Sequence, residues 1–286
     1  MSEPKTKTVI FSKNRTLQLK SLLRSLGENS DIDDAEIDVI YTTEADIPYE
    51  PLMSQFACRF VRQGDFLADV REAVEGSDCS YVLFMVDDLI CRDTFSLRRV
   101  ESLLDRRSDI DCFSLRLGRN IQDGAAPDFE SVDDDILVWD TKPSLGRTWR
   151  YFWEVSSSLY RRDLVLDYIG RCDPHRVSFP NPFESHYYSC MPSHIGGHPV
   201  KRLIRGIKTI GVRRRGRMAC FERSKCFTQG VNLVAERDID YQTLFEPREL
   251  HDKMEEGFVI DYQSLRQIEN TRPNVGSRYF QLVKEA

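Results

Sequence analysis

Two adjacent carboxylates, Asp87 and Asp88, stand at the end of an apolar run that begins at residue 81. A short run of β-forming and aromatic residues is typical of a strand buried on both faces of a mostly parallel sheet. In such sheets, ligands bind beyond the carboxyl ends of the strands. Neighbouring carboxylates repel each other unless a cation neutralises them, so the pair predicts a Mg²⁺ or Mn²⁺ site with phosphate as its companion. The alternative is a solvated loop or helix cap after the strand.

Polar and basic residues stand at the ends of two other predicted strands. Ser12 and Arg15 follow an apolar run at residues 8–12, while Arg116 and Arg119 lie at the end of a run at residues 111–117. Guanidinium groups suit bidentate contacts with oxyanions, so one of the two later arginines is expected to bind a phosphate or a sugar hydroxyl. The alternatives are turn formation for Ser12 and Arg15 and surface salt bridges for the other two arginines.

The elements that would position these residues alternate along the chain. A strand at 8–12, a helix from Thr16 that Gly27 closes, and a strand at 37–42 predict a β-α-β unit with parallel strands. Strands are also expected at 56–61 and 111–117, and helices at 66–75 and 95–106. This alternation predicts an α/β fold, a mostly parallel sheet flanked by helices. We expect one domain at residues 1–240 and a helical C-terminal extension at 241–286, packed on it.

Composition limits the classes of protein that this chain can belong to. It has 286 residues, of which 41% are hydrophobic, and a formal net charge of −6. Net acidity argues against a general nucleic-acid binder. The chain shows neither the apolar core of a signal peptide nor an apolar stretch of about 20 residues that could span a membrane. The eight cysteines are scattered and several lie in apolar runs, which favours buried thiols in a reducing, cytoplasmic compartment.

A basic run at residues 201–217, from Lys201 to Arg217, stands out in this acidic chain. Three interpretations compete. The run could bind a pyrophosphate, it could bind the surface of an anionic membrane that holds a lipid-linked substrate, or it could be a solvated face. Apolar residues within the run give it an amphipathic character, which is compatible with a peripheral membrane contact.

Three stretches, read in order, resemble bacterial glycosyltransferases of the GT-A type. They are TVIFSKNRTLQL at 8–19, VLFMVDD at 82–88 and CFSLRLGRNI at 112–121. They match the first strand and turn, the D-x-D-like strand end and the strand that follows. Looser matches are NPFE at 181–184, CFERSK at 220–225, NLV at 232–234 and LHDKMEEGFVID at 250–261. The individual motifs are short, so the resemblance depends on their order and spacing.

The resemblance implies a GT-A-like fold that binds a nucleotide-diphospho-sugar donor over the N-terminal strands. Asp88 would then hold a divalent cation bridging the two phosphates, Asp87 would assist or contact the ribose, and Ser12 and Arg15 would contact the donor. A metal there neutralises the charge that builds on the departing nucleoside diphosphate. The chain departs from the family's usual acidic run, because Val86 precedes the pair and Leu89 follows it.

An inverting transfer also needs a carboxylate that takes the proton of the acceptor hydroxyl. Glu184, in a proline-rich segment expected to be irregular, is our first candidate, and Glu154 is the second. An exposed loop acid is the alternative for Glu184. Aromatic residues near Glu154, such as Trp149 and Trp153, could form a platform for a sugar or could belong to the core.

The sequence thus predicts a metal-assisted, inverting glycosyltransferase of the cytoplasm. Its acceptor would be a glycan or a lipid-linked glycan of the cell surface or of a secreted polysaccharide. A sugar-phosphate nucleotidyltransferase is the nearest alternative enzyme, although the turn after the first strand lacks the glycines that such enzymes carry. A non-catalytic protein of the same fold that binds sugar or nucleotide is the alternative from another class.

Overall fold

The centre of the fold is a nine-stranded mixed sheet. In the computed structural model, the described residues are 5–43, 47–191, 216–232 and 245–285. The strand order is β3-β2-β1-β4-β9-β6-β10-β8-β7. The strands are β1 (Thr6–Lys13), β2 (Ile37–Thr42), β3 (Arg59–Arg62), β4 (Tyr81–Val86), β6 (Cys112–Ser114), β7 (Glu130–Val132), β8 (Ile136–Asp140), β9 (Ser158–Arg161) and β10 (Arg217–Phe221).

The directions of these strands decide which residues meet at one edge of the sheet. Strands β1 to β4 are mutually parallel, as predicted for β1 and β2. Strand β9 is antiparallel to both β4 and β6, and Ser158 at its start pairs with Phe84 and with Ser114. The carboxyl ends of β1, β4 and β6 therefore lie at the same edge as the start of β9.

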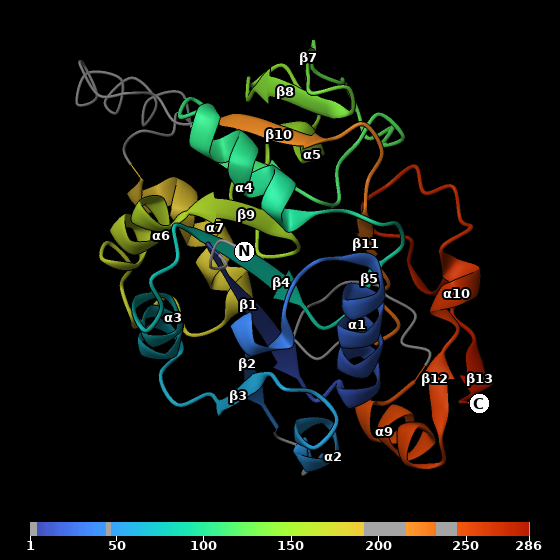
Figure 1. Ribbon diagram of the computed structural model, residues 1–286. Helices are drawn as coiled ribbons and strands as arrows, with labels where there is room; N and C mark the ends of the chain where they lie inside the picture. The colour runs from blue at the N-terminus through green and yellow to red at the C-terminus, as the bar shows by residue number, and fades with distance from the viewer. Residues whose placement is uncertain (1–4, 44–46, 192–215, 233–244, 286) are drawn as a thin grey trace.

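Helices cover both faces of the sheet (Figure 1). One core cluster joins it to α1 (Thr16–Asn29), α4 (Leu97–Arg106) and α9 (Pro247–Glu255), and the other joins it to α3 (Phe66–Glu75), α6 (Arg162–Ile169) and α7 (Pro180–Cys190). Strand β4 contributes to both clusters because its successive side chains point to opposite faces of the sheet. Leu83 and Met85 belong to the first cluster, whereas Val82 and Phe84 belong to the second. Shorter helices are α2 (Glu50–Met53), α5 (Arg147–Arg150) and α10 (Tyr262–Leu265).

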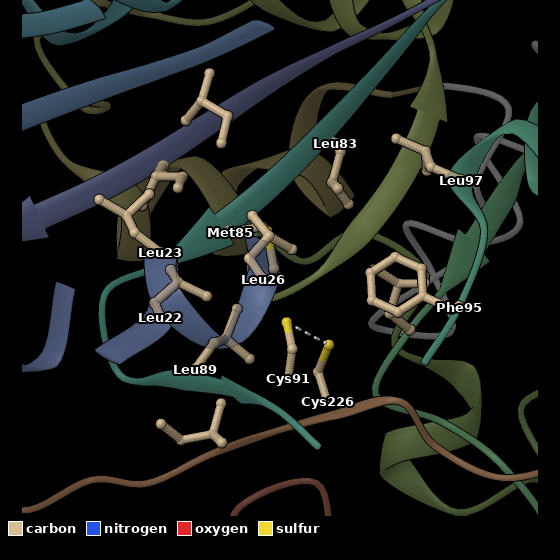
Figure 2. Packing of buried hydrophobic residues seen from close by; sticks show 14 of the residues in the cluster. Leu22, Leu23, Leu26, Leu83, Met85, Leu89, Cys91, Phe95, Leu97 and Cys226 are labelled. Atoms are coloured by element: carbon tan, nitrogen blue, oxygen red, sulfur yellow. Dashed lines mark hydrogen bonds between the residues drawn. The ribbon is translucent and has the colours of Figure 1, made fainter. Parts of the chain in front are cut away.

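Two short strands form a small second sheet, and the first of them packs against α1 and carries the chain away from Asp88. Strand β5 (Leu89–Cys91) pairs with β11 (Cys226–Thr228) in antiparallel fashion. Figure 2 shows their buried cysteines beside the leucines of α1, and the Sγ atoms of Cys91 and Cys226 are 3.4 Å apart. The pairing also places Gln229 next to the acidic pair, because its backbone N–H donates to the Asp88 carbonyl at 2.7 Å.

The C-terminal part is mixed, not helical as we expected. Besides α9 and α10 it contains β12 (Phe258–Ile260) and β13 (Leu282–Lys284), which pair in antiparallel fashion. Its apolar residues Leu250 and Met254 belong to the same core cluster as the α1 leucines. The predicted boundary at residue 240 lies outside the described residues, so the division into two parts stays a prediction.

Two local expectations were wrong. Helix α1 does not end at Gly27 but continues to Asn29. The segment around Glu184, expected to be irregular because of its prolines, is helix α7. Pro180 and Pro182 lie in its first turn, where backbone N–H groups have no partner within the helix and proline is tolerated. Within the described ranges, no helix is both long and apolar enough to cross a membrane.

Candidate functional site

The first cluster of predicted site residues lies where β1 and β4 end. Asp87 is buried, with 3% of its surface exposed. Its Oδ2 accepts hydrogen bonds from the Ser12 hydroxyl at 3.0 Å and from the Lys13 backbone N–H at 3.1 Å. The pKa of Asp87 is raised because the carboxylate is buried, and the positive charge of Arg15 offsets only part of this shift. Asp87 thus ties the end of β4 to the turn after β1, and the Ser12 hydroxyl is committed to this contact and to Tyr49.

Arg15 lies between the two carboxylates. Its Nη1 is 3.0 Å from Asp87 Oδ1 and 3.2 Å from Asp88 Oδ2. The same guanidinium donates through Nε to Asn232 Oδ1 at 2.8 Å and through Nη2 to the Asn232 carbonyl. The protein therefore supplies part of the positive charge that we expected a metal to supply. The predicted contact of Arg15 with a donor competes with these four bonds.

The donor set at this strand end bears directly on the predicted metal. Both oxygens of Asp87 already accept hydrogen bonds. Asp88 is more accessible, with a side chain 17% exposed, and one of its oxygens contacts Arg15. In the parts of the chain that the structure describes, no group of three or more His, Cys, Asp or Glu side chains could hold a metal. Of the two carboxylates only Asp88 is accessible, so a divalent cation here would have Asp88 as its one carboxylate ligand and would need further oxygen ligands from phosphate or water.

The second cluster forms around Glu184 on α7. Its Oε1 accepts a hydrogen bond from the Val155 backbone N–H at 2.7 Å, and its Oε2 accepts one from the Tyr151 hydroxyl at 3.2 Å. Burial, with the negative charge of Glu154 as the next cause, raises the pKa of Glu184 from 4.5 to about 7. A carboxylate with a pKa near neutral pH suits general base catalysis.

Glu154, our second candidate, pairs with Arg116, and its negative charge helps to raise the pKa of Glu184. It is only 2% exposed. Its carboxylate accepts hydrogen bonds from the Ser156 backbone N–H at 2.9 Å and from the Ser158 hydroxyl. Arg116 Nη2 lies 3.0 Å from its Oε2. Glu154 is buried and, unlike Glu184, does not line the cavity described next, so it suits the positioning of Arg116 better than proton transfer.

A cavity of about 1030 Å³ opens beside Glu184. Its lining includes Arg116, Tyr151 and Glu184, together with residues of the C-terminal segment 268–276. Pockets of a few hundred to about 1000 Å³ accommodate small-molecule ligands. The cavity is therefore large enough for a substrate whose hydroxyl would reach the Glu184 carboxylate.

The wall of this cavity is joined to the acidic pair. Thr228 donates its backbone N–H to the Pro273 carbonyl at 2.9 Å and accepts from Val275 at 3.0 Å. The next residue, Gln229, donates to the Asp88 carbonyl at 2.7 Å. The two clusters thus share one edge of the sheet and one stretch of backbone.

Other residues that we considered for the site have the structural contacts given above as their alternatives. Arg119 is exposed and forms an ion pair with Glu222 at 2.6 Å, as a surface salt bridge would. Trp149 and Trp153 are fully buried and belong to the core. The basic run at 201–217 lies outside the described residues except for its last two positions.

Several contacts of the site were not predicted from the sequence, although Asn232 belongs to one of the looser motif matches. Asn232 and Tyr49 contact Arg15. Gln229 is 2% exposed, and neither side-chain atom of its amide has a hydrogen-bond partner. Such contacts join segments far apart in the chain, so residue spacing could not reveal them.

Comparison with known proteins finds no match among family models or curated sequences. Among solved structures, S. aureus TarS matches over 64% of this chain and 33% of its own length, at 15% identity and a TM-score of 0.44. TarS 1-349 in complex with UDP matches over 64% of this chain and 55% of its own, at 13% identity and a TM-score of 0.40.

Mannosyltransferase PcManGT from Pyrobaculum calidifontis, in complex with GDP-Man and Mn²⁺, matches over 66% of this chain and 52% of its own, at 12% identity and a TM-score of 0.37. The chain thus spans between a third and about half of these proteins' lengths. Likeness at this level assigns neither a substrate nor an activity to the chain.

Proposed function

We propose that this chain is a glycosyltransferase that moves a sugar from a nucleotide-diphosphate donor to a hydroxyl acceptor. The observation that carries the proposal is the position of Glu184. It lines a substrate-sized cavity, its pKa is raised to about 7, and it lies at the sheet edge that also holds Asp88. A base that faces the acceptor and an acidic strand end that faces the leaving group are the two parts that such a transfer requires.

In this proposal, Glu184 takes the proton of the acceptor hydroxyl as that oxygen attacks the anomeric carbon. Direct attack by the acceptor inverts the configuration at that carbon. Tyr151 and the Val155 N–H orient the carboxylate, while Glu154 holds Arg116 at the cavity wall. Asp88 would ligate a Mg²⁺ or Mn²⁺ ion, which supplies positive charge to the diphosphate when bound. Asp87 and Arg15 keep the strand end in place.

Nucleotide binding tests the donor half of the proposal. Isothermal titration of UDP and GDP, with and without Mn²⁺, should show binding that Mn²⁺ strengthens in the wild-type chain. Asp88→Ala should remove the gain that Mn²⁺ provides. If neither nucleoside diphosphate binds in either condition, the chain is not a transferase of this kind.

Substitution of the base tests the chemical half. Glu184→Gln keeps one acceptor oxygen for the Val155 N–H, and its amide NH2 can donate to the Tyr151 hydroxyl oxygen, so donor binding should be unchanged. Transfer should fall by about 10²–10⁴-fold, the usual contribution of a general base. Near-normal turnover in this variant would remove Glu184 from the mechanism. If the wild-type chain binds nucleotide normally but shows no turnover on any acceptor, a non-catalytic binding protein is favoured instead.

A further inference from the structure

The cavity beside Glu184 carries arginines that the protein does not neutralise. Arg147, Arg272 and Arg278 line it and are exposed. No carboxylate lies within ion-pair distance of any of them among the described residues. By contrast, other arginines near the cavity are paired, with Arg116 bound to Glu154 and Arg223 to Glu269.

The acidic residues of the lining do not balance these three charges. Glu269 is occupied by Arg223 at 2.5 Å. Asp123 accepts a hydrogen bond from the Thr148 hydroxyl and is one fixed negative charge. Glu184 is only partly ionised near neutral pH, because its pKa is raised to about 7. The lining is therefore net positive, although the whole chain is acidic.

The backbone that carries the arginines is held by buried polar contacts. Asn270 is 3% exposed, and its side chain and carbonyl accept hydrogen bonds from Arg92 at 2.6 Å and from Asn120 at 2.8 Å. Arg147 begins helix α5 directly after Gly146, whose N–H donates to the Ala125 carbonyl at 2.8 Å. A fixed backbone lowers the cost of ordering a binding site, and these contacts fix the backbone near Arg147 and Arg272 before a ligand binds.

We propose that this cavity binds an acceptor that carries a phosphate or a carboxylate, with Arg147, Arg272 and Arg278 as its anion-binding groups. The inference rests on the proposed function, which places the acceptor beside Glu184. The arginines are assigned to the acceptor because the cavity lining includes Glu184 but none of Asp87, Asp88 and Arg15. Exposed guanidinium groups attract either anion.

Sugars that differ only in charge test this inference. The affinities of D-glucose, D-glucuronate and D-glucose 6-phosphate are measured by saturation-transfer NMR, with and without saturating UDP and Mn²⁺. The wild-type chain should bind at least one charged sugar about tenfold more tightly than glucose, and salt should weaken that preference. The stronger of the two charged sugars tells phosphate from carboxylate.

The double variant Arg147→Gln, Arg278→Gln should lose the preference and keep its affinity for UDP. Arg150→Gln is the matched control, because Arg150 is exposed on the same short helix but does not line the cavity. Equal affinity for charged and neutral sugars would overturn the inference. Loss of UDP binding in the double variant would also overturn it, since the arginines would then serve the donor. Failure of the wild-type chain to bind any nucleotide, with the preference for charged sugars intact, would refute the proposed function instead.

Discussion

Glu184 combines access to a cavity with a pKa near neutrality, and these two properties give a testable pH dependence. Only the ionised carboxylate accepts a proton from the acceptor. With the pKa raised to about 7, we expect kcat/KM for transfer to rise about tenfold per pH unit below 7 and to level off above it. The measurement is a pH–rate profile between pH 5 and 9. A profile that is already flat at pH 5 would show that a group with an ordinary carboxylate pKa, or none, is the base.

The same pKa shift predicts a change in stability. Because the pKa of Glu184 is raised above its ordinary value of 4.5, the native state binds more protons than the unfolded state between these values. The contribution of Glu184 to stability is therefore full below about pH 4.5 and is lost as pH rises through about 7. Glu184→Gln does not titrate, so its stability relative to the wild type should rise between pH 5 and pH 8 by about 1–3 kcal/mol.

Urea denaturation at both pH values measures this difference. Glu222→Gln is a suitable control, since that exposed carboxylate contacts Arg119 at the surface and should show little change. A difference that stays constant between pH 5 and pH 8 would contradict the assignment of a raised pKa to Glu184.

At the residue level, the sequence predicted residue types better than roles. Asp88, Glu184, Glu154 and Arg116 were all chosen in advance, and the structure brings the last three together. It could not be foreseen that Arg15 would lie between the two acids, because that contact depends on the end of β1 meeting the end of β4. A pair of carboxylates looks the same in a sequence whether a metal or a guanidinium neutralises it.

At the scale of elements, the close approach of two strand ends makes Gly118 a sensitive position. It follows β6, and a Cβ added there would lie 2.4 Å from the backbone N of Ser224. Gly118→Ala should therefore destabilise the protein by about 1–3 kcal/mol, as overpacking of backbone does. Gly27 in α1 has open space around its Cβ position, so Gly27→Ala should stabilise by about 0.5–1 kcal/mol. Thermal unfolding of both variants checks the pair, and equal effects would contradict it.

Elements with a clear apolar period were predicted well, and those that depend on distant partners were not. The expected strands at 8–12 and 37–42 and the helix at 66–75 correspond to β1, β2 and α3. Helix α7 was missed because prolines usually end helices, although here they begin one. Strand β13 is only three residues long, and its pairing with β12 is what makes it a strand. Pairing of that kind is a tertiary effect and leaves no local pattern.

On the scale of the whole molecule, the antiparallel strand β9 explains why the two clusters share a site. It lies between β4 and β6, so the ends of those strands are separated by one strand. Adjacent strands lie about 4.8 Å apart, which keeps the acidic pair and the Arg116–Glu154 pair at one edge of the sheet. The C-terminal segment lies at the same edge, where Asn274 pairs with Thr228 in an isolated β-bridge. The site therefore requires both ends of the chain.

This arrangement predicts that the C-terminal segment unfolds together with the sheet. Leu250 on α9 is 1% exposed and belongs to the core cluster of α1, whereas all three tryptophans, Trp139, Trp149 and Trp153, belong to the cluster on the other face. Leu250→Ala should cost about 2–5 kcal/mol. If the segment is integral to the fold, tryptophan fluorescence and far-UV circular dichroism should shift to the same lower urea midpoint. Arg248→Ala, at an exposed position of the same helix, should leave both midpoints nearly unchanged. An independent extension would instead lose helical signal early while the fluorescence midpoint stayed at its wild-type value.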